Sequence, residues 1–217
     1  MLYVIDSKVP ERARLDIFER VNGGVPLTRQ QMRNCLYNGP ATRFLQQEAS
    51  TDLFRRATSG SLRQDTMRDR EFVNRFCAFQ ILGADLYQGD MDDFLASVLN
   101  HMNRMSNDEL DRLSEEFRTT LENNYRVFDK HAFRKHRRKQ NRRSVVNASL
   151  WDIMSTGLST VSPRIASARA EKIKDAFYVL QEDRRFIDAI TYSPNDTKRV
   201  KYRFAAMKRL MQEVFDD

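Results

Sequence analysis

The sequence FERVNGGVPLTRQQMRNCLYNG, residues 18–39, predicts a helix, a hard turn and a second helix. Apolar residues at three- and four-residue steps give the first helix, from Pro10 to Asn22, one apolar face. Gly23 and Gly24 end that helix, because glycine adopts the left-handed conformation without steric cost. Thr28 begins the second helix, since its hydroxyl can cap a backbone amide while Gln31 caps in return.

A stripe of polar side chains runs along the second helix at positions i, i+3, i+4 and i+7. This polar stripe comprises Gln30, Arg33, Asn34 and Tyr37. The opposite face carries Met32, Cys35 and Leu36. Two interpretations are open: an ordinary solvated face, which is the more common case, or the lining of a binding site.

The composition of the whole chain is typical of helical proteins. Glycine and proline are few, at 7 and 5 of 217 residues, while good helix formers recur at helical spacing. We therefore expect an all-α fold, an irregular bundle of about 8–10 helices with one short N-terminal strand at residues 2–5. It is predicted to be a single domain over residues 1–217, or two packed subdomains, 10–129 and 144–217, joined by the segment 130–143.

Capping residues mark the starts of several helices along the chain. Starts are predicted at Asp90, Ser106, Asn147 and Ser162. A helix over 68–82 carries a stripe of phenylalanines that we assign to the core, and a last helix is expected over 197–215.

The two cysteines, Cys35 and Cys77, lie on apolar faces and are expected to be buried free thiols, as is typical of a reducing cytoplasm. The N-terminal sequence lacks the pattern of a secretory signal, and no apolar run approaches the length of a membrane span. A cytoplasmic location without membrane contact is therefore expected.

The net charge of +7 is concentrated in one segment, KHAFRKHRRKQNRR, residues 130–143. It holds eight Lys or Arg residues and no acid, so the rest of the chain sums to −1. Dense positive charge neutralises nucleic-acid phosphates without base contacts. We predict non-specific DNA binding through Arg134, Lys135, Arg137, Arg138, Lys139, Arg142 and Arg143. The alternative is a solvated loop without a ligand.

Signatures of catalysis and of bound cofactors are missing from the sequence. Glycine motifs for phosphates and dinucleotides are absent, and His101, His131 and His136 lack the i, i+4 spacing of a zinc-binding pair. Neighbouring acids such as Asp92 and Asp93 point to different sides of a helix. We therefore predict no catalytic residue, no metal and no cofactor.

Short motifs occur along the chain in a recognisable order. F-x-R-x-N, G-G-x-x-L and Q-x-x-R-N are carried by Phe18, Arg20, Asn22, Gly23, Gly24, Leu27, Gln30, Arg33 and Asn34. Further blocks lie at residues 69–79, 87–94 and 133–135 and in the helix that follows Asn147. Together they resemble the GmrSD-type restriction endonuclease family, whose shared domain is domain of unknown function two-six-two. Only the first motif is specific.

Three features of that family are missing or altered here. The family's domain begins with a ParB/sulfiredoxin-like α/β half, whose aspartate-glycine-glutamine-glutamine-arginine motif is associated with nucleotide binding or hydrolysis. Some members also end in a His-Me finger nuclease module. Neither occurs in this sequence, and Asn22 abuts Gly23 where the family usually has a small residue between them. The chain therefore resembles the helical second half of the domain.

The resemblance implies a non-catalytic helical module of a restriction or phage-defence protein, which binds a partner chain and, through the basic segment, DNA. The alternatives are a nuclease or nucleotide-hydrolysing enzyme, and a structural scaffold without a ligand. A partner carrying the missing α/β half, or a second copy of this chain, is expected to dock at residues 2–5. The motif residues Arg20 and Asn22 and the polar stripe form the second candidate surface.

Overall fold

The computed structural model describes Val9, Ala13, Ile17 and residues 26–216. In that part of the chain the regular structure is eleven α-helices and two short 3-10 helices, with no strand, so the predicted all-α fold is confirmed. The helices are α2 (Arg29–Leu36), α3 (Pro40–Ala49), α4 (Asp52–Thr58), α5 (Arg68–Ile81), η1 (Ala84–Leu86), α6 (Met91–Met102), α7 (Asn107–Phe128), η2 (Asp129–His131), α8 (Ala148–Gly157), α9 (Pro163–Ala168), α10 (Ala170–Glu182), α11 (Arg184–Thr191) and α12 (Thr197–Phe215).

Several predictions for the N-terminus lie outside the described residues. These are the strand at residues 2–5, the turn at Gly23 and Gly24, the motif residues Arg20 and Asn22, and most of the helix expected from Pro10 to Asn22.

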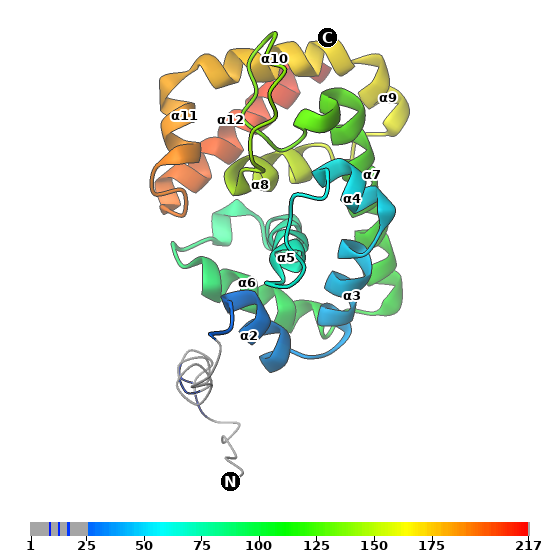
Figure 1. Cartoon of the computed structure of the whole chain (residues 1–217), viewed down its shortest axis with the longest axis vertical. Coiled ribbons are helices and arrows are strands. Elements are labelled where there is room, and N and C mark those ends of the chain that lie inside the picture. The colour runs from blue at the N-terminus through cyan, green and yellow to red at the C-terminus, as the bar shows by residue number, and fades with distance from the viewer. Residues whose placement is uncertain (1–8, 10–12, 14–16, 18–25, 217) are drawn as a thin grey trace.

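The central helix of the molecule is α5, which packs against α2, α3, α6 and α8 (Figure 1). The long α7 contacts α4, α8, α9 and α10, and α12 contacts α8, α10 and α11. Figure 1 shows α2, α3 and α6 in the lower half of the molecule and α8–α12 in the upper half. α5 and α8 join the two halves.

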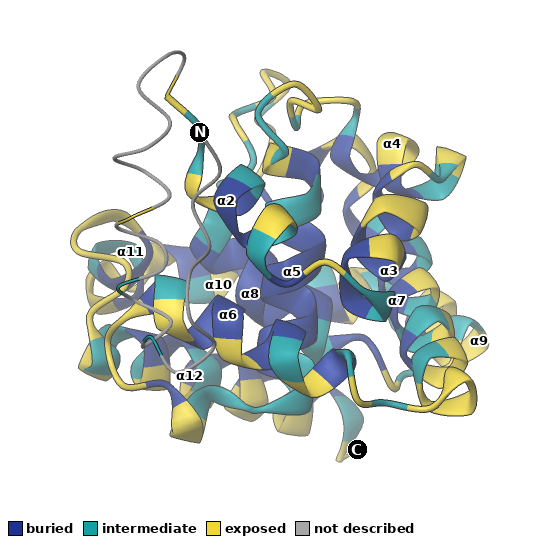
Figure 2. Cartoon of the chain, turned by 90° about the horizontal axis from the view of Figure 1, so that it is seen from below, coloured by how far each residue is buried: buried dark blue, intermediate teal, exposed yellow. Residues whose placement is uncertain are grey.

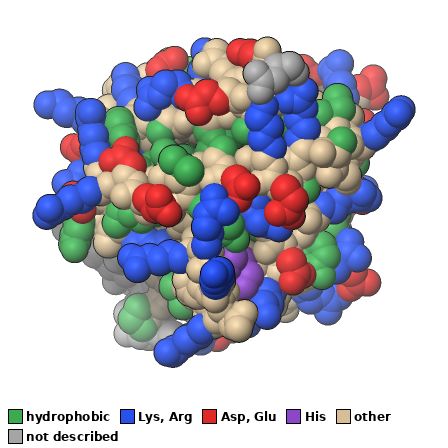
Figure 3. Space-filling view, turned by 90° about the horizontal axis from the view of Figure 1, so that it is seen from above, with side chains coloured by type: hydrophobic (Ala, Val, Ile, Leu, Met, Phe, Trp, Pro, Cys, Tyr) green, Lys and Arg blue, Asp and Glu red, His purple; other side chains and the backbone are tan. Residues whose placement is uncertain are grey.

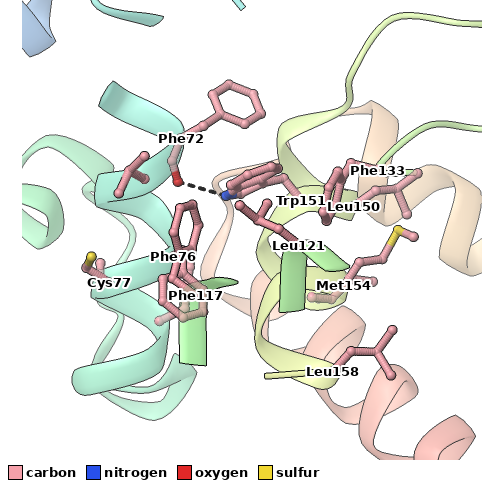
Figure 4. Close-up of a cluster of buried hydrophobic side chains, with 14 of the residues drawn as sticks. Phe72, Phe76, Cys77, Phe117, Leu121, Phe133, Leu150, Trp151, Met154 and Leu158 are labelled. Carbon is pink, nitrogen blue, oxygen red and sulfur yellow. Dashed lines mark hydrogen bonds between the residues drawn. The ribbon is translucent and has the colours of Figure 1, made fainter. Parts of the chain in front are cut away.

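Trp151 of α8 lies in the core between the two halves. Its ring centroid is 5.2 Å from that of Phe72, 5.9 Å from Phe54 and 4.4 Å from Phe133. Its indole Nε1 donates to the carbonyl of Phe72 at 2.8 Å (Figure 4). Buried apolar side chains from 37 to 214 belong to one core cluster, which Figure 2 shows as dark blue on the inner helices. Residues on either side of the segment 130–143 thus share one core.

The predicted helix starts are confirmed in the structure. Thr28 and Gln31 form a reciprocal capping box, as do Ser106 and Glu109. The Asp90 carboxylate accepts from two amides of α6, and the side chains of Asn147 and Ser162 cap α8 and α9. No helix in the described part of the chain is both long enough and apolar enough to cross a membrane.

One expectation for the cysteines is wrong. Cys77 is buried, and this burial raises the pKa of its thiol. Cys35 is exposed, although Met32 on the same face of α2 is buried.

Candidate functional site

The basic segment begins in η2, and from residue 132 it forms a loop that leads to α8 and rises beside α10 at the top of Figure 1. An isolated antiparallel bridge between Arg134 and Val146 closes its base. The amide of Asn147 donates to the carbonyl of Phe133 at 2.9 Å, and the hydroxyl of Ser144 donates to the carbonyl of Lys135 at 2.6 Å. The two ends of the loop are therefore fixed to one another.

Phe133 enters this loop in the left-handed region, with φ of 61°, which is uncommon for a bulky residue. Its side chain is fully buried against Trp151. Tertiary packing of this kind offsets the strain of the backbone.

Arg134 requires a correction, because the structure removes it from the predicted DNA-binding set. Its side chain is 0% exposed and donates inward, to the carbonyls of Ala132 and Thr58 at 2.9 and 2.8 Å and to the hydroxyl of Ser61 at 2.6 Å. Burial, followed by the nearby charge of Arg143, lowers the pKa of Arg134 to about 10. Arg134 anchors the loop to the turn after α4 and does not reach solvent.

Side chains of α10 fix the middle of the loop. The amide of Gln181 donates to the carbonyl of His136 at 2.7 Å and accepts from its backbone N–H at 3.1 Å. The Tyr178 hydroxyl lies 3.0 Å from Nδ1 of His136, whose ring stacks on that of His131 with centroids 3.7 Å apart. Within the loop, the Gln140 side chain accepts from the amide of Arg137 at 3.2 Å. The loop backbone is therefore held in one shape.

The remaining basic side chains of the loop differ in their surroundings. Lys135 is half-buried and donates to the hydroxyl of Thr191 at 2.5 Å, and burial lowers its pKa. Arg138 pairs with Asp175 at 2.5 Å and lies over the Tyr178 ring. Exposed side chains that make no ion pair with the described residues are Arg137, Lys139, Arg142 and Arg143. Figure 3 shows this face from above, with Lys and Arg side chains spread over it and a smaller number of acids between them.

The polar stripe of α2 faces inward, so the interpretation as a solvated face is wrong. Gln30, Arg33 and Tyr37 are buried, and Asn34 is half-buried. Arg33 donates from Nε to Gln30 at 3.1 Å and from Nη1 to Asp92 of α6. Asn74 of α5 also donates to Gln30, at 3.4 Å. The stripe thus joins three motif blocks inside the protein, and Gln30 and Arg33 do not form an exposed docking surface.

A second buried polar group was not predicted from the sequence. Arg75 of α5 donates to both carboxylate oxygens of Asp152, at 2.8 and 2.7 Å, and Arg203 of α12 adds a bond of 2.8 Å. Burial is the largest influence on each guanidinium, but the bidentate contact with Asp152 leaves the pKa of Arg75 raised, whereas that of Arg203 is lowered. Arg75 shares helical spacing with Phe72, Phe76 and Phe79, which is the signal that could have revealed it.

No cluster of three or more metal-ligand side chains occurs among the residues that the structure describes. His131 and His136 stack face to face and do not converge on a common point. Comparison with models of known families, with curated protein sequences and with solved structures gave no match for this chain. The similarity to the GmrSD-type family therefore rests on the short motifs alone.

Proposed function

We propose that this chain is a non-catalytic helical module of a GmrSD-like restriction or phage-defence protein, which binds DNA without sequence preference through its basic loop. The observation that carries the proposal is that four basic side chains of the loop are exposed and unpaired among the described residues: Arg137, Lys139, Arg142 and Arg143. All four are exposed and make no ion pair with the described residues, on a loop whose backbone is fixed. Charges that are not already neutralised can each displace a counterion from DNA.

The fixed backbone supports binding over the alternative of a solvated loop. Gln181 and Tyr178 hold the middle of the loop, and Arg134 holds its base. A ligand would therefore lose little conformational freedom of the backbone when it binds, which favours affinity.

Salt-dependent binding of duplex DNA tests the proposal. The test variant replaces four side chains with glutamine, at Arg137, Lys139, Arg142 and Arg143. Each lysine or arginine that contacts a phosphate contributes about 0.9 to the slope of log affinity against log salt, so the slope should flatten by about 3 to 4. Fluorescence anisotropy over a salt series measures it.

The matched control removes the same number of exposed charges outside the loop, at Arg43, Arg55, Arg104 and Arg112. It should leave the slope nearly unchanged. Equal slopes for the wild type and the loop variant would reject the loop as the DNA surface, and binding lost equally in both variants would indicate only a general charge effect.

A partner chain is a further part of the proposal, and the strand-like sequence of residues 2–5 motivates it. Sedimentation of the full chain, with and without residues 1–6, tests whether self-association or capture of an α/β partner depends on that segment. A monomer in both cases, with no partner captured, would contradict it.

A further inference from the structure

A cavity of about 580 Å³ lies where α2, the start of α5 and the start of α6 meet. Its volume falls within the usual range for small-molecule sites. The arginines Arg33 and Arg75 line it, with only 1% and 4% of their surface exposed. Its lining includes no residue of the basic segment 130–143.

Each of these buried arginines keeps one nitrogen without a partner. Arg33 uses Nε and Nη1 for Gln30 and Asp92, and Nη2 has no acceptor in the described part of the chain. Arg75 uses Nε and Nη2 for Asp152, and its Nη1 has none. Neither nitrogen is among the fully buried polar atoms that lack a partner, so both are accessible and can donate to an acceptor in the cavity.

Each acidic side chain of the cavity already accepts a hydrogen bond within the protein. Asp92 pairs with Arg33 and, at 3.7 Å, with Arg29. Both oxygens of Glu71 accept from Arg68 at 3.1 Å. The Asp90 carboxylate caps α6 through two backbone amides. The cavity therefore offers hydrogen-bond donors for a ligand, while at least one oxygen of each of its carboxylates is in use.

The local charge also favours an anion. Asp152 is shared by two guanidiniums, those of Arg75 and Arg203, so this buried group carries a net positive charge. Burial lowers the pKa of Arg33, and the charge of Arg75 adds to this effect, although Asp92 opposes it. An anion between the two arginines would relieve their repulsion.

We propose that this cavity binds a phosphate group, which Arg33 and Arg75 hold through Nη2 and Nη1. Guanidinium groups suit phosphate because their planar nitrogens match its oxygens. The phosphate can come from inorganic phosphate, from a nucleotide or from a nucleic-acid backbone. The last source has a continuous route, because Thr66 and Arg68 also line a neighbouring cavity that includes Arg143 of the loop.

Calorimetric titration of the full chain with inorganic phosphate, at constant ionic strength in chloride buffer, tests the proposal. Arg33→Gln should weaken binding by about tenfold or more, because it removes a charge-assisted donor. Arg70→Gln is the matched control, since Arg70 lies on α5 but does not line the cavity. No binding to the folded wild type, or equal binding by R33Q and R70Q, would overturn the proposal.

A gain of affinity separates the proposal from a loss of folding. Asp92→Asn removes the carboxylate that competes for Arg33, and should strengthen phosphate binding several-fold. Asp93→Asn is the control, because it removes the same charge one residue later and outside the cavity. If D92N binds phosphate no more tightly than D93N, Arg33 is not the group that holds it.

The source of the phosphate follows from two further titrations, with adenosine monophosphate and with a short single-stranded oligonucleotide. Tighter binding of either one than of phosphate, lost in R33Q, supports the site and identifies the source. The variant with four glutamines in the loop should bind inorganic phosphate as the wild type does. Failure of the DNA proposal would therefore leave this result intact, and the reverse also holds.

Discussion

The basic side chains of the cavity and those of the loop are in opposite surroundings. Arg33 and Arg75 are almost completely buried, and carboxylates neutralise part of their charge. Arg137 and Arg142 are exposed on a loop and make no ion pair with the described residues. Around the cavity, the low dielectric of the protein interior strengthens each electrostatic interaction, so an unpaired charge is costly. In the loop, solvent screens each charge, so DNA binding depends on how many charges contact phosphates.

This difference predicts how substitutions should act. A change in the buried region leaves an unpaired charge inside the protein and should reduce stability. A change in the loop should leave stability nearly untouched and alter only binding. Substitutions in the two regions therefore test this division.

Asp152→Ala should be the most damaging substitution. It leaves Arg75 and Arg203 buried without their carboxylate, and the loss of one partner from a buried ion pair costs about 3–5 kcal/mol. Urea denaturation measures the free energy of unfolding. The control is Glu122→Ala, which breaks the half-exposed pair with Arg126 and should cost less than about 1 kcal/mol. Equal losses in the two variants would contradict the division between the regions.

Arg134→Ala should have an intermediate effect, because Arg134 is the one buried arginine of the loop segment. Its removal leaves the carbonyl of Ala132 without a donor, at a cost of about 1–3 kcal/mol, while the carbonyl of Thr58 keeps only the amide of Ser61. Hydrogen exchange should also become faster over residues 132–146. Arg137→Ala is the control and should change neither quantity. Unchanged exchange in R134A would show that Arg134 does not anchor the loop.

The local features of the fold were predictable from the sequence. α12 begins and ends where the pattern places it, at 197 and 215, and the capping boxes at Thr28 and Ser106 form as expected. Caps depend on residues three positions apart, so sequence alone contains the information. Phe72 and Phe76 are fully buried, as the apolar stripe of α5 predicts.

The candidate site was predictable only in part. Periodicity identified the residues that share a face of α2, but not whether that face meets water. Arg33 is buried because Asp92, 59 positions away, accepts its hydrogen bond. Arg134 likewise depends on Thr58, 76 positions away. Charge density along the sequence could not separate Arg134 from the exposed arginines beside it, because such partners come together only in the folded chain.

Acidification should cause a smaller loss of stability, because His131 of η2 takes up a proton. Burial, and then the charges of His136 and Lys130, lower the pKa of His131 below its usual 6.5. The unfolded chain therefore binds this proton more readily, so stability is complete above pH 6.5 and decreases as the pH falls towards the lowered value. Urea denaturation at pH 7.5 and 5.5 measures the decrease. His131→Phe keeps the stacked ring and should reduce it, whereas an equal decrease in both proteins would exclude His131 as its source.

Asp175→Asn should have the smallest effect on stability, below about 0.5 kcal/mol, because it breaks an exposed ion pair with Arg138. It releases a fifth basic side chain of the loop, so the salt dependence of DNA binding should steepen by about 0.9 if Arg138 then reaches a phosphate. Glu171→Gln is the control, since it removes the same charge from α10. Glu171 pairs with Lys174 and not with the loop. A D175N slope equal to that of E171Q would show that Arg138 does not take part in binding. A steeper slope at unchanged stability would show that the loop acts through the number of its unpaired charges, in contrast to the buried arginines around Asp152.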